Sequence, residues 1–298
     1  MSAIAAMQTW GPLATPIHSR QPARDANGTT WRDYALFTWW DPANEVYVMT
    51  HHMSSPDPGT PGRTRVSATV GDRSYEVIEV PADNSYDSES ISLDLGGRLT
   101  VDHPQLTLDV SFTPTYQAVD FHAAKGMPTL TPDTPLHHYE HPLRASGSVT
   151  LKGDSRAFDA AGLRDRTWGF RSETAQWAEY QYLMVDLDDS FLILLKMKGV
   201  VDPQRDIGFL LAEGNQEDVD FSWAFNGAGL FNDVNVVLPS GDELTLEVTA
   251  RPAGFWVPMG WRQTGTVLSA FDDFVLLRTG TGRDVAGLAT YGVLRTLT

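Results

Sequence analysis

The chain of 298 residues contains no cysteine. Disulfide bridges, thiolate metal sites and cysteine nucleophiles are therefore excluded. No apolar run reaches the roughly 20 residues that a membrane-spanning helix needs. The first ten residues are mildly apolar, but they have neither a basic flank nor a long apolar core, so we expect no signal peptide. These absences favour a cytoplasmic protein without stable membrane insertion.

Positive charge is also scarce. The 22 basic residues include only four lysines, and 38 acidic residues give a formal net charge of -16 at pH 7. Nucleic acids and anionic membrane surfaces attract clustered Lys and Arg, so neither is an expected partner. The content of 42% hydrophobic residues is ordinary for a soluble globular chain, and 298 residues suffice for one large or two ordinary domains.

The pattern of apolar residues predicts a protein that is nearly all β. Apolar and polar residues alternate in the segments 91–95, 106–112 and 243–249, as in strands with one face in a core and one in water. We find no long amphipathic helix. Turn signals separate the segments, at Gly71-Asp72, Gly96-Gly97, Asp188-Asp189 and Pro239-Ser240-Gly241-Asp242. Many short strands with regular turns predict antiparallel sandwiches or barrels.

Two aromatic segments break this alternation. Residues 31–40 and 177–187 carry large apolar side chains on both faces, so both faces must be covered. One face of each strand would pack against a second sheet or domain, and the other would line an interior. That interior is either a filled core or a cavity for an apolar ligand.

A connector divides the chain. Residues 121–142 contain four prolines and no clean period, which is typical of a domain linker or a functional loop. We place the boundary near Arg144. The predicted N-terminal β-domain then covers residues 1–144, and the C-terminal one covers residues 145–298.

The connector also holds several histidines. His137, His138 and His141 lie beside Glu140, and a metal site would use two of them with a carboxylate. The HExxH motif is absent and the spacing is not diagnostic, so we predict no metal. The alternatives are a polar loop with solvent-facing histidines, or one histidine that points into a cavity as an acid or base. We retain His138 and His141 as catalytic candidates.

Nucleotide motifs are missing as well. Gly280-Thr281-Gly282 has neither the third glycine nor the following helix of a dinucleotide loop, and no phosphate-binding loop is visible. We therefore expect no cofactor.

The most unusual stretch is residues 162–171, which read GLRDRTWGFR. Three arginines, one aspartate and a tryptophan fall in a single short segment. One interpretation is a structural cluster of ion pairs, in which the Trp168 side chain fills the end of a barrel. The other is a buried carboxylate, Asp165, at the mouth of an apolar cavity. Because neighbouring strand residues face opposite sides, Arg164 and Arg166 would then point outward and Asp165 would face the cavity.

This stretch resembles the signature of the lipocalin-like family of carotenoid 1,2-hydratase and AttH proteins, with Arg where the hydratase commonly has His. Two further segments are similar to that family: residues 31–42, which end in WWDP, and residues 139–149, which begin with YEH. The resemblance implies two tandem lipocalin-like antiparallel β-barrel domains around an apolar pocket. Family members include hydratases of isoprenoid double bonds, terpenoid cyclases and pericyclases that fold polyketide chains.

Residue chemistry and resemblance together predict acid activation in a dry pocket. Burial raises the pKa of a carboxyl group, and Asp165 is the predicted proton donor. Tyr180, His138 and His141 complete the catalytic candidates. Aromatic faces would stabilise a developing carbocation, and these residues are the predicted substrate-binding set: Trp168, Trp177, Tyr182, Trp39 and Trp256.

The predicted function is a cofactor-independent cyclase or hydratase of a hydrophobic, isoprenoid-like small molecule. Two alternatives stay open: a pericyclase of polyketide biosynthesis and a non-catalytic carrier of an apolar metabolite. A carrier would have only apolar groups and a simple hydrogen bond in its pocket, whereas an enzyme would have an ionisable group there.

Overall fold

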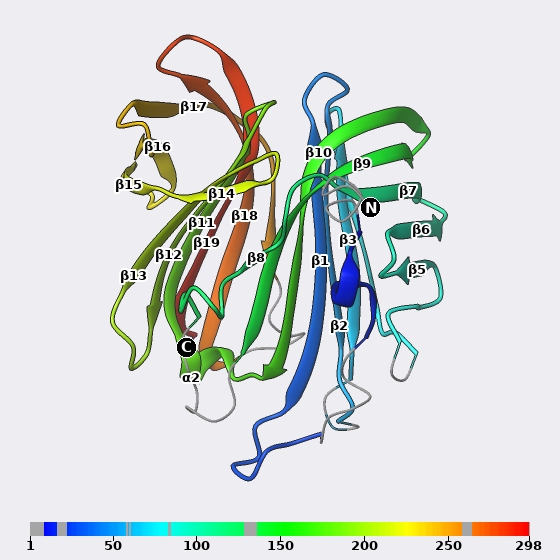
Figure 1. Cartoon of the computed structure of the whole chain (residues 1–298). Coiled ribbons are helices and arrows are strands. Elements are labelled where there is room, and N and C mark those ends of the chain that lie inside the picture. The colour runs from blue at the N-terminus through cyan, green and yellow to red at the C-terminus, as the bar shows by residue number, and fades with distance from the viewer. Residues whose placement is uncertain are drawn as a thin grey trace. The chain divides into compact units, whose positions relative to one another are not determined.

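The computed structural model describes residues 9–16, 23–57, 59, 61–82, 85–127, 136–257 and 264–297. Its two compact units are Met1–Ser172 and Glu173–Thr298. Each unit is built on one antiparallel sheet, and of the two sheets one is a half-barrel and the other a nearly closed barrel (Figure 1). The prediction of an all-β chain with two tandem barrel-like domains is confirmed. No helix in the described residues is long and apolar enough to cross a membrane.

The sheet of the first unit has the strand order β4-β3-β2-β1-β10-β9-β7-β6-β5, and β8 pairs with β9. A short 3-10 helix, η1 (Gly11–Ala14), precedes the strands. The strands are β1 (Trp31–Asp41), β2 (Val46–Ser54), β3 (Arg63–Val70), β4 (Arg73–Glu79), β5 (Ile91–Asp94), β6 (Arg98–His103), β7 (Leu106–Pro114), β8 (Val119–Asp120), β9 (His137–Leu151) and β10 (Asp154–Phe170).

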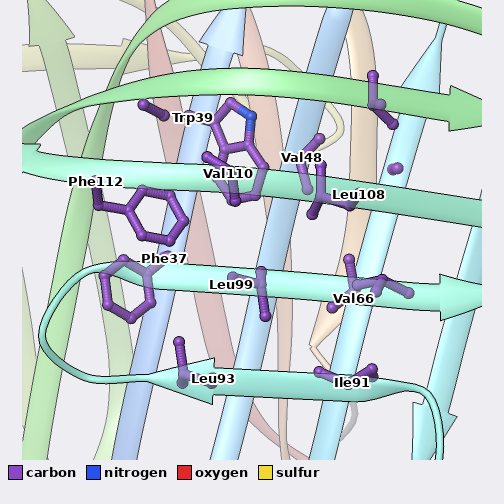
Figure 2. Close-up of a cluster of buried hydrophobic side chains, with 14 of the residues drawn as sticks. Phe37, Trp39, Val48, Val66, Ile91, Leu93, Leu99, Leu108, Val110 and Phe112 are labelled. Atoms are coloured by element: carbon purple, nitrogen blue, oxygen red, sulfur yellow. The ribbon is translucent and has the colours of Figure 1, made fainter.

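The core of this unit lies on the inner face of the sheet. Phe37 and Trp39 of β1 alternate toward it, and they meet side chains from β2, β3 and β5 to β7 (Figure 2). The ring centroids of Phe37 and Phe112 are 4.4 Å apart in a stacked arrangement. The alternation predicted at 91–95 and 106–112 appears as β5 and β7, where buried and exposed residues alternate.

The sheet of the second unit has the order β14-β13-β12-β11-β19-β18-β17-β16-β15. Among the described residues of this unit, α2 (Glu173–Gln176) is the single helical turn. The strands are β11 (Trp177–Asp186), β12 (Phe191–Gly199), β13 (Arg205–Ala212), β14 (Asn215–Asp218), β15 (Asp220–Phe225), β16 (Phe231–Val237), β17 (Glu243–Val257), β18 (Gly265–Thr279) and β19 (Asp284–Leu297). Leu183 and Val185 of β11 point into its apolar core.

All four predicted turns connect neighbouring antiparallel strands, namely β3 to β4, β5 to β6, β11 to β12 and β16 to β17. Gly71 and Gly97 have positive φ angles of 58° and 117°, which glycine adopts without a steric penalty. The turn-forming residues of the sequence therefore mark these hairpins.

The division between the units differs from the predicted boundary. Arg144 lies inside β9, which pairs along its length with β10, so the chain continues in the first sheet until Ser172. The proline-rich connector is also shorter than expected, because residues 137–142 already belong to β9. Residues 128–135 of that connector lie outside the described residues. A strand that enters a sheet directly from a loop leaves no sign in the sequence of which sheet it joins.

Candidate functional site

A cluster of ionisable side chains lies on the long β9–β10 hairpin. The antiparallel register places Asp165 opposite Glu140 and Thr167 opposite His138. Side chains two residues apart on a strand share a face, so these four side chains lie together. His138 and Glu140 are buried, while the Asp165 side chain keeps 24% of its surface exposed. Asp165 is thus the member of the cluster that a substrate can reach.

His138 is held at both ring nitrogens. Nδ1 lies 2.7 Å from Oγ1 of Thr167, and the same hydroxyl donates to Oδ1 of Asp165 over 2.8 Å. A hydroxyl has one proton, so Thr167 accepts its bond with His138 and the proton of that bond belongs to Nδ1. Nε2 lies 3.2 Å from Oε1 of Glu140, an acceptor, and therefore also carries a proton. The contacts suit a doubly protonated imidazolium.

The electrostatics agree with this assignment. Burial opposes the charged form of His138, but the negative charges of Asp165 and Glu140 outweigh it, and the positive charge of Arg171 offsets them only in part. The net result is a pKa of His138 above its ordinary value of 6.5. His138 is therefore a proton reservoir connected to Asp165 through one hydroxyl.

We expect an NMR titration to give His138 a pKa above 6.5. Asp165→Asn should lower that pKa, because it removes the negative charge that contributes most to raising it. Since the folded-state pKa is raised, the contribution of His138 to stability is full below pH 6.5 and is lost as the pH rises through that pKa. Asp94→Asn, on the exposed surface of β5, is the control and should leave the titration unchanged. An unshifted titration in Asp165→Asn would contradict the coupling.

Two arginines of the GLRDRTWGFR segment lie on the other face of β10. Arg164 and Arg166 point into the core side of the first unit and are fully buried. The alternation that separates them from Asp165 is as predicted, but the prediction that they point outward is wrong. Inside the unit, Arg164 donates to the backbone oxygens of Leu95 and Leu13.

Arg166 forms a buried ion pair with Asp33 of β1. Both side chains are fully buried, and Nη2 of Arg166 lies 2.9 Å from Oδ2 of Asp33 while Nη1 contacts Oδ1. Burial lowers the pKa of Arg166 to about 9, which still leaves the group charged at neutral pH.

Trp168 stacks between His137 and Tyr139, whose ring centroids lie 5.0 and 5.3 Å from that of Trp168. The inner face of this segment therefore corresponds to the structural ion-pair interpretation.

The three neighbouring histidines do not form one group. His137 and His141 lie on the same face of β9 as the buried arginines, and His138 lies on the opposite face. Nε2 of His141 bonds to the backbone oxygen of Tyr116 at 2.8 Å, and burial lowers its pKa to about 4. Of the two predicted catalytic histidines, only His138 joins Asp165.

A metal ion has one possible set of ligands among the described residues. Single ligand atoms of His138, Glu140 and Asp165 lie within 4.8 Å of one another. Both nitrogens of His138 act as hydrogen-bond donors in this arrangement, which leaves no lone pair for a metal. The cluster is therefore better suited to holding protons than to holding a metal.

The predicted aromatic residues are distributed over both units. Trp39 is fully buried in the core, where its ring lies 5.3 Å from that of Phe112. Trp177 is buried at the start of β11, and the rings of Tyr180 and Tyr182 are 5.8 Å apart. Trp256 is 58% exposed. Tyr182 lines a pocket in the second unit.

Two members of the cluster are absent from the predicted site residues. The sequence singles out Glu140 only as a metal ligand beside the histidines, and it does not single out Thr167. The alternation of strand faces could have identified both, because residues 138 and 140 share a face of one strand and residues 165 and 167 share a face of the next.

Comparison with solved structures assigns the fold. A putative AttH from Nitrosomonas europaea superposes with a TM-score of 0.55 at 15% identity, covering 93% of this chain and 96% of its own. Kievitone hydratase from Nectria haematococca gives 0.57 at 12% identity, covering 97% and 96%. CghA with Sch210972 gives 0.58 at 12% identity, covering 98% and 97%. No curated protein matches the sequence significantly.

These similarities and the two antiparallel sheets define the fold: the chain has the tandem lipocalin-like fold that the sequence resemblance implied. The chain belongs to the family described as Domain of unknown function (DUF7064), whose model matches residues 17–288.

Proposed function

We propose that this chain is a cofactor-independent enzyme that protonates a hydrophobic, isoprenoid-like small molecule, as a hydratase or cyclase does. The observation that carries the proposal is the hydrogen-bonded series from His138 through Thr167 to Asp165. Such a series can carry a proton from a buried donor to a carboxylate that a substrate can reach. The similarity to kievitone hydratase is consistent with this chemistry on the same fold.

The proton path follows from the donors and acceptors. A proton leaves Nδ1 of His138 for the oxygen of Thr167, while the hydroxyl proton of Thr167 moves to Oδ1 of Asp165. Asp165 then delivers its proton to one carbon of a substrate double bond, and the other carbon becomes cationic. Water adds to that carbon and releases a proton to solvent, or an internal double bond closes a ring and the new cation loses a proton to solvent as a double bond forms. Leu36 and Leu163 line the same face beside Asp165 and suit an apolar substrate.

Isotope labelling tests the proposal while the substrate is still unidentified. The purified protein is incubated with an apolar metabolite extract of its native host in D2O that contains H2 18O, and the products are followed by mass spectrometry. Hydration should add deuterium on carbon together with 18O, and proton-initiated cyclisation should add deuterium alone. A rearrangement with neither label would instead indicate a pericyclase, and release of an unchanged molecule on denaturation would indicate a carrier.

Removal of metal ions by chelation distinguishes the proton relay from metal chemistry. Exhaustive dialysis against EDTA should leave label incorporation unchanged. Loss on chelation with recovery on adding a divalent ion would overturn the relay and assign His138, Glu140 and Asp165 to a metal.

A further inference from the structure

The second unit contains a pocket that is independent of the relay. All of its lining residues belong to β11 and β15 to β19 or to the β15–β16 turn. It holds about 330 Å³ of space, counting its open mouth. The enclosed part is narrow, so it admits one end of a ligand while the remainder lies in the mouth.

The pocket continues the interior of the barrel beyond its apolar core. Gln181 lies two residues before Leu183 on β11, and Asp273 two residues before Val275 on β18, so both point inward with those core residues. Tyr291 lies two residues after Ala289 on β19 in the same way. Ligands of small barrels commonly bind in such interior space at the mouth.

The polar groups of the pocket have unused bonding capacity. Gln181 is 8% exposed, and its Nε2 donates to Oε1 of Glu179 over 2.9 Å. That bond fixes the amide orientation, because a carboxylate only accepts. Oε1 of Gln181 and Nε1 of Trp223 are buried and have no hydrogen-bond partner among the described residues. Buried acceptors and donors are nearly always satisfied, so each requires a partner beyond the described residues, and a bound ligand can supply it.

The remaining lining defines the ligand further. Arg251 and Asp273 form an ion pair, so their charges cancel and the pocket favours neither an anion nor a cation. Phe231, Phe271 and Tyr291 supply aromatic walls. We propose that this pocket binds a neutral, planar aromatic or conjugated molecule that donates a hydroxyl proton to Gln181 and offers an oxygen to Trp223. The second unit is then a ligand-binding module in its own right.

The test uses 2-naphthol and naphthalene as probes, titrated into the full chain and followed by isothermal calorimetry. We expect saturable binding of one 2-naphthol per chain. Gln181→Leu should weaken it about 3- to 10-fold, as the loss of one hydrogen bond predicts. The same variant should bind naphthalene as the unchanged chain does, because naphthalene has no hydroxyl group.

Matched variants keep the result interpretable. Gln216→Leu makes the same change on the exposed surface of β14 and should not alter the binding of either probe. Trp223→Phe keeps an aromatic ring but removes the N–H group and should weaken 2-naphthol selectively. Thermal unfolding of each variant verifies that it is folded, and Gln181→Met replaces Gln181→Leu if the latter is not. Absence of saturable 2-naphthol binding, or equal affinity in the folded Gln181 and Gln216 variants, would overturn the proposal.

Discussion

Replacing Asp33 with alanine is expected to lower the free energy of unfolding of the chain by about 3–5 kcal/mol, measured by urea denaturation. Asp33 and Arg166 are both fully buried, and their contact is bidentate. Removal of the carboxylate leaves a guanidinium in the interior without its counter-charge. The cost is therefore mainly that of an unpaired buried ion rather than the net value of the pair.

Two comparisons separate this effect from a general loss of charge. Asp109→Ala breaks a pair with Arg98 in which the side chains are 60% and 58% exposed, and it should change stability little. The double variant Asp33→Leu with Arg166→Met removes both charges and should lose less than Asp33→Ala alone. A folded Asp33→Ala variant with an unchanged urea midpoint would show that the pair does not support the fold.

The sequence predicts the strands of this chain better than it predicts the faces of its central strands. The segments at 91–95 and 106–112 alternate cleanly, and their buried positions follow from that alternation alone. β10 carries charged or aromatic residues on both faces around Asp165. Alternation shows that Arg164 and Asp165 face opposite sides, but it does not show which side is the interior. That choice depends on Asp33 and on the backbone oxygens of Leu13 in η1 and Leu95 in the β5–β6 turn, which are distant in sequence.

The candidate site depends on register in the same way. His138 and Asp165 are predicted from separate segments for separate reasons, and the β9–β10 pairing is what brings them together. Alternation groups Glu140 with His138 and Thr167 with Asp165, but only the pairing of the two strands shows that all four lie together. Odd- and even-numbered residues of a strand lie on opposite faces, which separates His141 from His138. This inference requires that residues 137–142 are recognised as a strand rather than as part of a proline-rich connector.

Asp165→Asn is expected to reduce turnover on the order of 10²-fold or more, on whichever substrate the labelling experiment identifies. Asparagine keeps the shape of the side chain and accepts the bond from Thr167, but its amide cannot carry the proton to the substrate. The urea midpoint should change little, because Asp165 is partly exposed and lies outside the buried Asp33–Arg166 pair. Asp159→Asn, at an exposed position of the same strand, is the control and should retain full turnover.

The hydroxyl of Thr167 decides whether Asp165 acts alone or as the end of a relay. Thr167→Val keeps the branched shape but removes the hydroxyl that bonds to both His138 and Asp165. If His138 returns a proton to Asp165 after each turnover, Thr167→Val should lose nearly as much turnover as Asp165→Asn. Thr167→Ser should then retain most of the turnover. A structural role for Thr167 predicts a different pattern, with lowered stability in Thr167→Val and unchanged turnover in whatever fraction stays folded. Full turnover in a stable Thr167→Val variant would leave Asp165 as a proton donor supplied directly by solvent.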